Sequence, residues 1–373
     1  MNFYEQFRSS WLTSLIGFAL FIVGTLILFW NEGRAVHITL SLQEALDQAI
    51  SLKYDRPFDS SAEGRLVHIY GPLVTGEPLT EMDYNIMVQA VKLKRRVQMY
   101  QHVEETIEHK YGDSVVSTDA EDRTYYYTKE FRDDLVDSRS FYIRHGHENP
   151  TKFPMDSRLY TAEHVTIGDY ELGNELKEKF TTFQEVTSDT RPDDSLIKLH
   201  SGMYYHCMDI FNPEIGDIRI QFSFAGLQGE VYTTVGRLEN NKIVPFRSKL
   251  GKKVLILFKG EYELNDVFDK EHRSQKWTTW GFRFIGFVLI FFAVTCVSHL
   301  LTTILTSNRF TAHLAPNPAN LFASNLGFAL STALLITSVA WILHRPWLGA
   351  SLLCTAITPA LFRRPAVRYQ RMD

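Results

Sequence analysis

Cysteine is scarce in this sequence, whose 373 residues contain only three. Cys207 lies in the polar middle of the chain, whereas Cys296 and Cys354 lie in long apolar stretches. A lone cysteine excludes an intrachain disulfide in the middle part, so Cys207 is either a buried free thiol or a link between two chains. Asn-x-Ser/Thr acceptor sites for glycosylation are also absent. Glycosylation therefore gives no guide to the side of a membrane on which a segment lies.

Motifs that carry common enzyme chemistry are absent as well. The chain has no Gly-x-Ser-x-Gly nucleophile elbow and no glycine-rich phosphate loop. His145 and His147 flank Gly146 and suggest a metal, but no cysteine or acidic cluster completes a set of ligands. A glycine-containing turn before Asn149 and Pro150 is the other interpretation of this stretch. We expect no catalytic residue, cofactor or metal site, and the sequence predicts a protein that is not an enzyme.

Charge is nearly missing from Phe284–Phe362. These 79 residues hold no Asp, Glu or Lys, and Arg309 and Arg345 divide them into three apolar runs. A helix of roughly 20 residues crosses the hydrocarbon core of a bilayer, which is about 30 Å thick. Core helices of a soluble domain, the alternative, seldom lack charge on every face. We therefore predict membrane spans at 284–306, 321–343 and 346–363, of which the last is short.

A fourth uncharged run, 12–31, lies near the N-terminus. Trp30, near its end, is the kind of aromatic residue that is enriched at a membrane interface. A cleaved signal peptide is the competing interpretation. The run is longer than a usual signal core, however, and no small-x-small cleavage site follows it. We interpret the run as an uncleaved membrane anchor.

Arginines beside the spans predict the orientation of the chain. Cytosolic segments carry an excess of Lys and Arg, and four spans place both termini on the same side. With the N-terminus in the cytosol, only Arg345 falls in a short loop on the opposite side. The long middle segment lies on that opposite side as well, in a lumen, the perinuclear space or the exterior. The basic residues on the cytosolic side are Arg8, Arg309, Arg363, Arg364, Arg368 and Arg371.

The middle segment, Gly33–Arg283, is polar and mildly acidic. It holds 32 basic and 40 acidic residues, a balance that does not suggest nucleic acid as a partner. Val91–Val103 alternates apolar and polar residues, which predicts a strand with one buried face and with Lys92–Arg96 largely on a solvated face. Ser41 and Glu44 form a capping-box pattern, which predicts a short amphipathic helix that begins there. The other predicted strands are 64–70, 123–131, 216–224, 230–237, 243–246 and 253–259, and Leu264–Lys276 reads as a helix.

Two further patterns concern the spans themselves. Four tryptophans near the ends of the apolar runs predict membrane-interface positions: Trp30, Trp277, Trp280 and Trp347. Ala323, Gly327 and Ser331 form a stripe of small residues at intervals of four, which lets helix backbones approach closely in lipid. The stripe serves either packing within one chain or self-association.

The predicted fold class is a membrane α plus β protein. It has four transmembrane helices and a large, mostly antiparallel β-rich lumenal domain between the first two. The predicted segments are a cytosolic N-terminus (1–11), helix 1 (12–31), the lumenal or perinuclear domain (32–283), helix 2 (284–306), a cytosolic loop (307–320), helix 3 (321–343), helix 4 (346–363) and a basic cytosolic tail (364–373).

Eight stretches form a distinctive combination in this order: Asn31-Glu32-Gly33-Arg34-Ala35, Glu63–Ile69, Val91–Gln101, Gly146–Pro150, Gly216-Asp217, Phe222–Leu227, Val244-Pro245-Phe246 and Thr279-Trp280-Gly281. Together they resemble the LUMA family (transmembrane protein 43). The resemblance implies four spans, a large domain in the endoplasmic-reticulum lumen or perinuclear space, and residence in the inner nuclear membrane and endoplasmic reticulum. It also implies self-association, a role in nuclear-envelope organisation, and lamins and emerin-type proteins as partners.

Three functions are compatible with parts of this sequence. A self-associating membrane scaffold agrees with the resemblance, the missing catalytic motifs and the small-residue stripe. A channel or channel subunit would need polar groups inside the membrane, and His299 is the one ionisable candidate apart from arginine in the last three spans. A lumenal membrane enzyme would need a pocket that gathers His145, His147 and nearby acids. The scaffold is the function that we predict.

Overall fold

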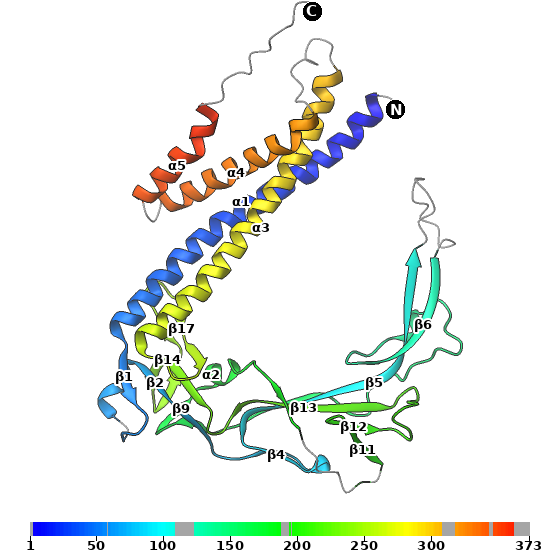
Figure 1. Cartoon of the computed structure of the whole chain (residues 1–373), viewed down its shortest axis with the longest axis vertical. Coiled ribbons are helices and arrows are strands. Elements are labelled where there is room, and N and C mark those ends of the chain that lie inside the picture. Colours follow the sequence, from blue (N-terminus) through cyan, green and yellow to red (C-terminus); the bar gives the residue numbers. More distant parts are fainter. Residues whose placement is uncertain are drawn as a thin grey trace, which may run out of the picture. The chain divides into compact units, whose positions relative to one another are not determined.

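The computed structural model describes residues 3–57, 59–108, 123–187, 194, 196–307, 318–342 and 346–361 (Figure 1). The chain divides into two units that interleave along the sequence. The helical unit is made of Met1–Asp47, Arg247–Val254 and Leu264–Asp373. The β-rich unit is made of Gln48–Phe246 and Leu255–Glu263. Each unit thus draws on segments that are far apart in the sequence.

Four helices build the helical unit: α1 (Phe3–Gln48), α3 (Leu264–Ser307), α4 (Pro318–Ile342) and α5 (Pro346–Leu361). Three of them contain segments long and apolar enough to cross a membrane, namely Thr13–Gln48, Leu264–Thr302 and Leu321–Ile342. The 16 residues of α5 are fewer than the roughly 20 that cross a bilayer. The structure therefore supports three spans, and the fourth, expected at 346–363, stays a prediction.

The first helix does not stop at the end of its apolar run. The expected separate helix with a cap at Ser41 is wrong, because α1 continues without a break from Phe3 to Gln48. An N-cap needs free backbone N–H groups, and inside a continuous helix the preceding turn already bonds them. The Ser41 hydroxyl instead lies 2.8 Å from that of Ser248. Glu44 accepts a hydrogen bond from the backbone N–H of Lys249.

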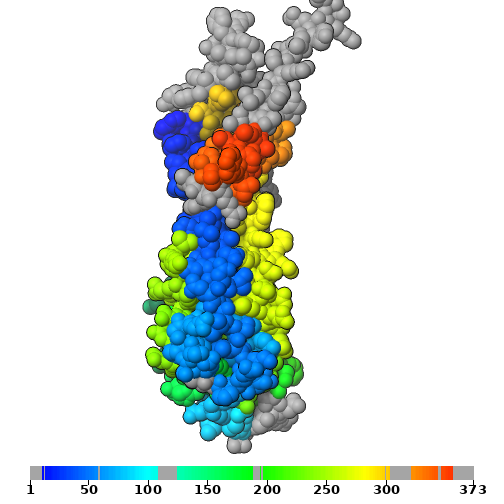
Figure 2. All heavy atoms as spheres, turned by 90° about the vertical axis from the view of Figure 1, so that its left-hand side faces the viewer, coloured from blue at the N-terminus to red at the C-terminus, as the bar shows by residue number. Residues whose placement is uncertain are grey.

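Close packing joins α1 to α3, which run alongside each other in blue and yellow (Figures 1 and 2). A Cβ added to Gly17 would lie 2.7 Å from Cys296 Cβ, and one added to Gly286 would lie 2.6 Å from the Leu28 side chain. Gly24 meets Ile290 and the Gly286 carbonyl in the same way. In lipid there is no hydrophobic driving force between helices, and small residues let two helix backbones approach closely. Van der Waals packing at these glycines therefore contributes to the contact between α1 and α3.

One seven-stranded sheet of the β-rich unit has the order β1-β2-β8-β9-β15-β14-β18, with a further pairing of β2 to β14. β1 pairs with β2, and β15 with β9, in parallel, whereas β14 pairs with β2, β15 and β18 in antiparallel fashion. The strands are β1 (Ile50–Lys53), β2 (Leu66–Thr75), β8 (Val165–Ile167), β9 (Tyr170–Leu172), β14 (Val231–Glu239), β15 (Lys242–Val244) and β18 (Ile256–Lys259).

The second seven-stranded sheet has the order β11-β12-β13-β5-β6, with β10 on β13 and β7 on β5. Its strands are β5 (Ala90–Glu108), β6 (Arg123–Arg132), β7 (Arg158–Thr161), β10 (Gln184–Glu185), β11 (Ile197–His200), β12 (Met203–His206) and β13 (Ile218–Leu227). The short pairs β3 (Leu79–Glu81) with β4 (Ile86–Val88) and β16 (Phe246–Arg247) with β17 (Lys253–Val254), the helix α2 (Asn174–Glu178) and the 3-10 turns η1 (Ser60–Ala62), η2 (Met82–Tyr84) and η4 (Ser138–Ser140) complete the described elements.

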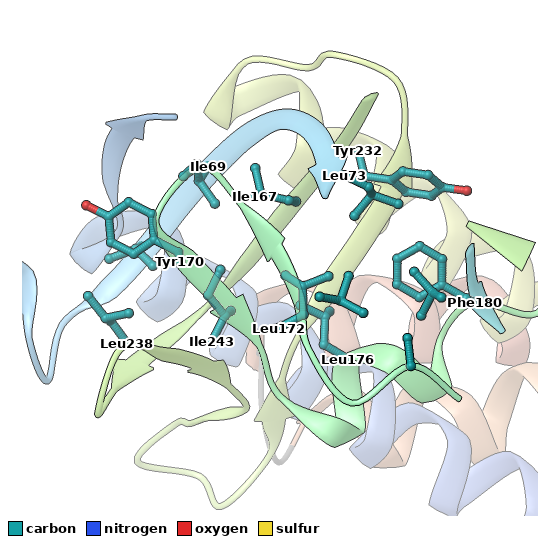
Figure 3. Packing of buried hydrophobic residues seen from close by; sticks show 14 of the residues in the cluster. Ile69, Leu73, Ile167, Tyr170, Leu172, Leu176, Phe180, Tyr232, Leu238 and Ile243 are labelled. Carbon is teal, nitrogen blue, oxygen red and sulfur yellow. The ribbon is translucent and has the colours of Figure 1, made fainter. Parts of the chain in front are cut away.

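Two apolar clusters stabilise the β-rich unit. In the first, side chains from β2, β8, β9 and β14 point toward one another, with Phe180 beside Tyr232 (Figure 3). In the second, Tyr84 lies 5.1 Å from the rings of both Tyr204 and Phe222. Full burial of one such side chain contributes about 1.5–3 kcal/mol. Both clusters draw on strands that are distant in sequence.

The prediction of one buried and one solvated face for β5 is confirmed for the apolar face and partly wrong for the polar face. Val91, Leu93, Val97 and Met99 are buried as expected. Lys94 and Arg96 are exposed, but Lys92 is buried and its Nζ donates to the Glu178 carbonyl at 2.9 Å. Arg95, on the apolar parity, pairs with the buried Glu81 at 3.0 Å. The second face of β5 is thus partly covered, here by the end of α2, where a solvated face was expected.

Candidate functional site at the ends of the apolar helices

A buried ion pair lies where the apolar parts of α1 and α3 end. Glu32 directly follows the first apolar run, and its side chain is 1% exposed. Arg283 directly precedes the second run. Arg283 Nε lies 2.6 Å from Glu32 Oε1, and Nη2 lies 2.8 Å from Oε2. Such a bidentate pair has a fixed geometry as well as a charge-assisted strength.

A third helix completes the site. Trp341, next to the end of α4, donates its indole N–H to Glu32 Oε2 at 2.6 Å. The Arg283 guanidinium also lies 4.9 Å from the Trp280 ring centroid and 5.8 Å from that of Trp341. Glu32 thus accepts three donors from two helices. A buried carboxylate is tolerated when it is paired and hydrogen-bonded in this way.

A second layer of polar contacts follows along α1 and α3. Asn31 Nδ2 donates to the Thr279 carbonyl at 3.1 Å. The Arg34 guanidinium lies within 3.5 Å of Gln275 Oε1 and Thr279 Oγ1, and over the ring of Phe282. At the far end of α4, Asn325 donates to Ser298 Oγ at 2.8 Å. Contacts at both ends show that α4 runs antiparallel to α3.

A cavity of about 740 Å³ opens beside the ion pair. Glu32 and Thr279, the two buried residues among the described lining, mark its inner end. The described residues that line it come from α1, α3 and, at Trp341, α4. The cavity combines apolar residues of α1 with charged residues of α3. Its lining residues are Glu32, Ala35, Val36, Ile38, Thr39, Gln43, Asp269, His272, Arg273, Gln275, Lys276, Thr279, Trp280, Arg283 and Trp341.

Of the residues singled out from the sequence, Trp280 lies in this site, where it lines the cavity and contacts Arg283. The predicted interface tryptophans Trp30, Trp277, Trp280 and Trp347 are all exposed. Of the stripe on α4, Ala323 and Gly327 are exposed, Ser331 is half-buried, and a Cβ on Gly327 would meet open space. The buried side of α4 carries Asn325, Ala329 and Ala333 instead. The topology-setting residues Arg363, Arg364, Arg368 and Arg371 lie outside the described residues.

Sequence reasoning missed Glu32 and Arg283 as partners. The available signal was an acidic residue directly after one apolar run and a basic residue directly before the next. It also missed the packing of α1 on α3, for which the signal was a spacing of seven residues between Gly17 and Gly24. Both signals depend on knowing which helices are neighbours.

The predicted histidine pair of the β-rich unit occupies a turn. The His147 N–H donates to the Arg144 carbonyl at 3.0 Å, and Gly146 has a φ of +82°. The His147 ring stacks on Tyr127 at 3.7 Å. Among the described residues no group of three or more His, Cys, Asp or Glu side chains could hold a metal. His145 and Gly146 therefore form a turn, as the second interpretation of the sequence has it.

A smaller cavity of about 400 Å³ lies elsewhere in the β-rich unit. Within its lining, the Tyr84 hydroxyl is 2.9 Å from His206 Nε2, and Asp83 and Asp194 are nearby. Burial raises the pKa of Tyr84 and lowers the pKa of His206, so both groups are held neutral at pH 7. Cys207, the next residue, is a buried free thiol whose pKa burial raises further. The neutral tyrosine and the neutral imidazole form a hydrogen-bonded pair.

Comparison with known proteins gives one consistent result. A family model described as Transmembrane protein 43 matches residues 99–346. The chain is 51% identical over 371 residues to a protein of Drosophila melanogaster named Transmembrane protein 43 homolog, and the match covers 99% of each chain. It is 30% identical over 383 residues to Transmembrane protein 43 of Homo sapiens, covering 100% of this chain and 94% of the human protein. No solved structure matches the chain.

Proposed function

Since the chain belongs to the transmembrane protein 43 family, we propose that it is a multi-pass membrane scaffold that gathers other proteins beside a membrane. Apolar helices fasten the chain in the bilayer, and the β-rich unit offers the surface for partners. Support for this function comes from one observation on that unit, namely large apolar side chains exposed at an edge of its second sheet.

The exposed apolar residues lie together beside β11. Phe211 and Met208 are each 81% exposed, and Leu196, directly before β11, is 65% exposed. The Lys198 side chain bonds the Met208 carbonyl, and the Phe211 ring lies 5.9 Å from that of His200. Leu196, Met208 and Phe211, here named the β11 patch, are therefore neighbours of one strand. Apolar groups gathered on a surface are typical of protein–protein contacts.

The finer parts of the proposal rest on the sequence. Four spans, with the N-terminus in the cytosol, place the β-rich unit in the endoplasmic-reticulum lumen or perinuclear space. The family resemblance favours the inner nuclear membrane and endoplasmic reticulum, self-association, and lamins and emerin-type proteins as partners. The stripe on α4, with Ala323 and Gly327 exposed and Ser331 half-buried, supports self-association, because small residues permit close helix contacts in lipid.

The two other functions have less support. Two polar pairs among the helices, Asn325 with Ser298 and Glu32 with Arg283, bond each other, which favours packed helices over a pore. The side chain of His299 lies outside the described residues. An enzyme site around His145 and His147 is not favoured either, because the His147 ring is stacked on Tyr127.

Site-specific photo-crosslinking in native membranes tests the scaffold. A photoreactive phenylalanine analogue replaces Phe211, and in a matched control it replaces Tyr142, which is also exposed but lies outside the β11 patch. We expect discrete adducts with a second protein from position 211, and their loss when Met208→Ser and Leu196→Ser are added. Adducts that are no more abundant at 211 than at 142 would contradict this use of the β11 patch.

Self-association is tested with two differently tagged copies of the full chain. Co-purification is expected when both are expressed in one membrane, and not when separate membranes are mixed after solubilisation. Ser331→Leu should lower the co-purified fraction, while Val339→Leu, also on an outward side of α4, should not. Equal co-purification of both variants would show that the stripe has no part in association.

A further inference from the structure

The cavity beside Glu32 holds positive charge that the ion pair does not use. Glu32 and Arg283 neutralise each other at its inner end. Arg273 and Lys276 lie at the rim, are both exposed and stand three residues apart, so they share one face of α3. In the described part of the chain, neither makes a hydrogen bond or an ion pair. Asp269 is the remaining acidic lining residue, which leaves the rim with a surplus of positive charge.

The position of these two cations along α3 matches the depth of a lipid headgroup. Trp280 and Phe284 stand where α3 turns from polar to apolar residues. At 1.5 Å per residue, Lys276 lies about 6 Å and Arg273 about 10 Å beyond Trp280 along the helix axis. Headgroups add roughly 5–8 Å on each side of the hydrocarbon core. Long basic side chains cover the small difference, because their flexible stems reach several ångströms.

The other walls suit an amphipathic ligand. Ala35, Val36 and Ile38 of α1 give the cavity an apolar side, whereas Thr39 and Gln43, further along α1, offer hydroxyl and amide groups. A volume of about 740 Å³ lies within the range of small-molecule sites. Apolar residues on one side and cations on the other match a molecule with a charged head and a hydrocarbon tail.

We propose that this cavity binds an anionic phospholipid, whose headgroup phosphate contacts Arg273 and Lys276. Their charges pair with the phosphate oxygens, and Val36 and Ile38 contact the apolar part of the lipid next to the headgroup. The Glu32–Arg283 pair fixes α1 against α3 and so holds the walls apart at the right spacing. A free phosphate ion shares the charge but would gain nothing from the apolar wall.

Lipid titration of the purified full-length chain, with native mass spectrometry as the readout, tests the site. The probe is phosphatidylglycerol, compared with phosphatidylcholine and with inorganic phosphate. One basic residue near an anionic lipid contributes about a fivefold change in affinity, so R273Q/K276Q should bind phosphatidylglycerol roughly 25-fold more weakly. The control R247Q/K252Q removes the same charge from exposed positions of the helical unit outside the cavity and should bind as the parent does.

Each other outcome overturns a part of the proposal. Equal retention of phosphatidylglycerol by R273Q/K276Q and the parent would refute the site. Equal retention of phosphatidylcholine and phosphatidylglycerol by the parent would refute selection of an anionic headgroup, and full displacement by millimolar inorganic phosphate would refute a lipid as ligand. Matching melting curves confirm that the variants fold. K276R, which keeps the charge, should retain binding, whereas K276Q alone should lose about fivefold.

Discussion

Arg283 and Glu32 meet as a bidentate ion pair across 251 positions of sequence, with Nε–Oε1 and Nη2–Oε2 distances of 2.6 and 2.8 Å. Their contact joins the start of one apolar helical segment to the end of another. Since Glu32 is buried, Arg283 does more than attract it: the pairing also offsets the cost of removing the Glu32 carboxylate from water. A buried charge left without its partner keeps the full cost of desolvation.

The first prediction is that Arg283→Ala destabilises the helical unit by about 3–5 kcal/mol, because it strands the Glu32 carboxylate. All six tryptophans belong to the helical unit, so tryptophan fluorescence in detergent reports the unfolding of that unit. Arg247→Ala, at an exposed position of the same unit, serves as the control. Replacing both partners, by Glu32→Leu with Arg283→Met, should restore most of the loss. If Arg283→Ala were as stable as Arg247→Ala, the ion pair would not contribute to the stability of the helical unit.

The second prediction concerns the third donor to Glu32. Trp341→Phe keeps an aromatic ring but removes the indole N–H, and hydrogen bonds to charged groups contribute about 1.5–3 kcal/mol. We expect a loss of free energy of unfolding in this range, measured by denaturant titration. Trp347→Phe is the matched control, because Trp347 is the most exposed tryptophan and should cost little. Similar losses from both changes would argue that ring size, not the N–H, matters.

The third prediction concerns the glycines between α1 and α3. Gly286→Val should destabilise by about 1–3 kcal/mol, since the new side chain would overlap Leu28. Gly327→Val makes the same change in a helix where a Cβ meets nothing within 4 Å. Melting temperatures of the two proteins in one detergent provide the measurement. Tolerance of valine at both positions would mean that the α1–α3 contact is looser than the structure has it.

The fourth prediction tests the orientation of the chain. Lys242→Thr creates an Asn-x-Thr acceptor at Asn240, which lies exposed in the turn between β14 and β15. If this turn is lumenal, the variant should gain one glycan, seen as slower migration that a glycosidase reverses. Lys242→Ala, without an acceptor, should migrate as the parent does. Absence of a glycan in the threonine variant, with normal folding, would place the β-rich unit in the cytosol.

The fifth prediction is a loss of stability of the β-rich unit as the pH falls. Burial lowers the pKa of His68, whose Nε2 lies 3.1 Å from the Tyr262 carbonyl and whose Nδ1 lies 3.0 Å from Ser51 Oγ. The folded state therefore binds a proton less readily than the unfolded chain. Stability is complete above the ordinary histidine pKa of about 6.5 and falls as the pH drops below that value.

Hydrogen exchange of peptides from β2 and β14 at pH 7.5 and 5.5 measures this effect. His68→Gln keeps a side chain that hydrogen-bonds but does not titrate, so it should reduce the difference in protection between the two pH values. His164→Gln, an exposed histidine of the same unit, is the control and should leave the difference unchanged. An unaltered pH response of His68→Gln would assign the effect to other groups, such as the half-buried His206.

Much of the architecture could be predicted because it depends on local patterns. Long uncharged runs predicted the helices of the helical unit, and the alternation of Val91, Leu93 and Val97 predicted the buried face of β5. The error at Ser41 has a local cause, since a capping pattern is informative only where a helix begins. Nothing in the nearby residues showed that α1 would continue past Glu32.

The candidate site could not be predicted because its parts come from three helices. Glu32, Arg283 and Trp341 are ordinary residues at the ends of apolar runs until the helices are placed side by side. The same limit applies to Lys92, whose burial depends on the Glu178 carbonyl at the end of α2. Sequence periodicity reports which face of an element is apolar, but it does not report which neighbour covers the other face.

The unbroken course of α1 makes the number of residues in it as important as their identity. Each residue turns an α-helix by about 100°, so one inserted between Glu32 and Ser41 would rotate everything beyond it by that angle. Glu32 would keep Arg283, while Ser41 would swing away from Ser248. Substitutions in this stretch are therefore tolerable where single insertions and deletions are not, and the helix serves as a fixed-length ruler between two anchoring points.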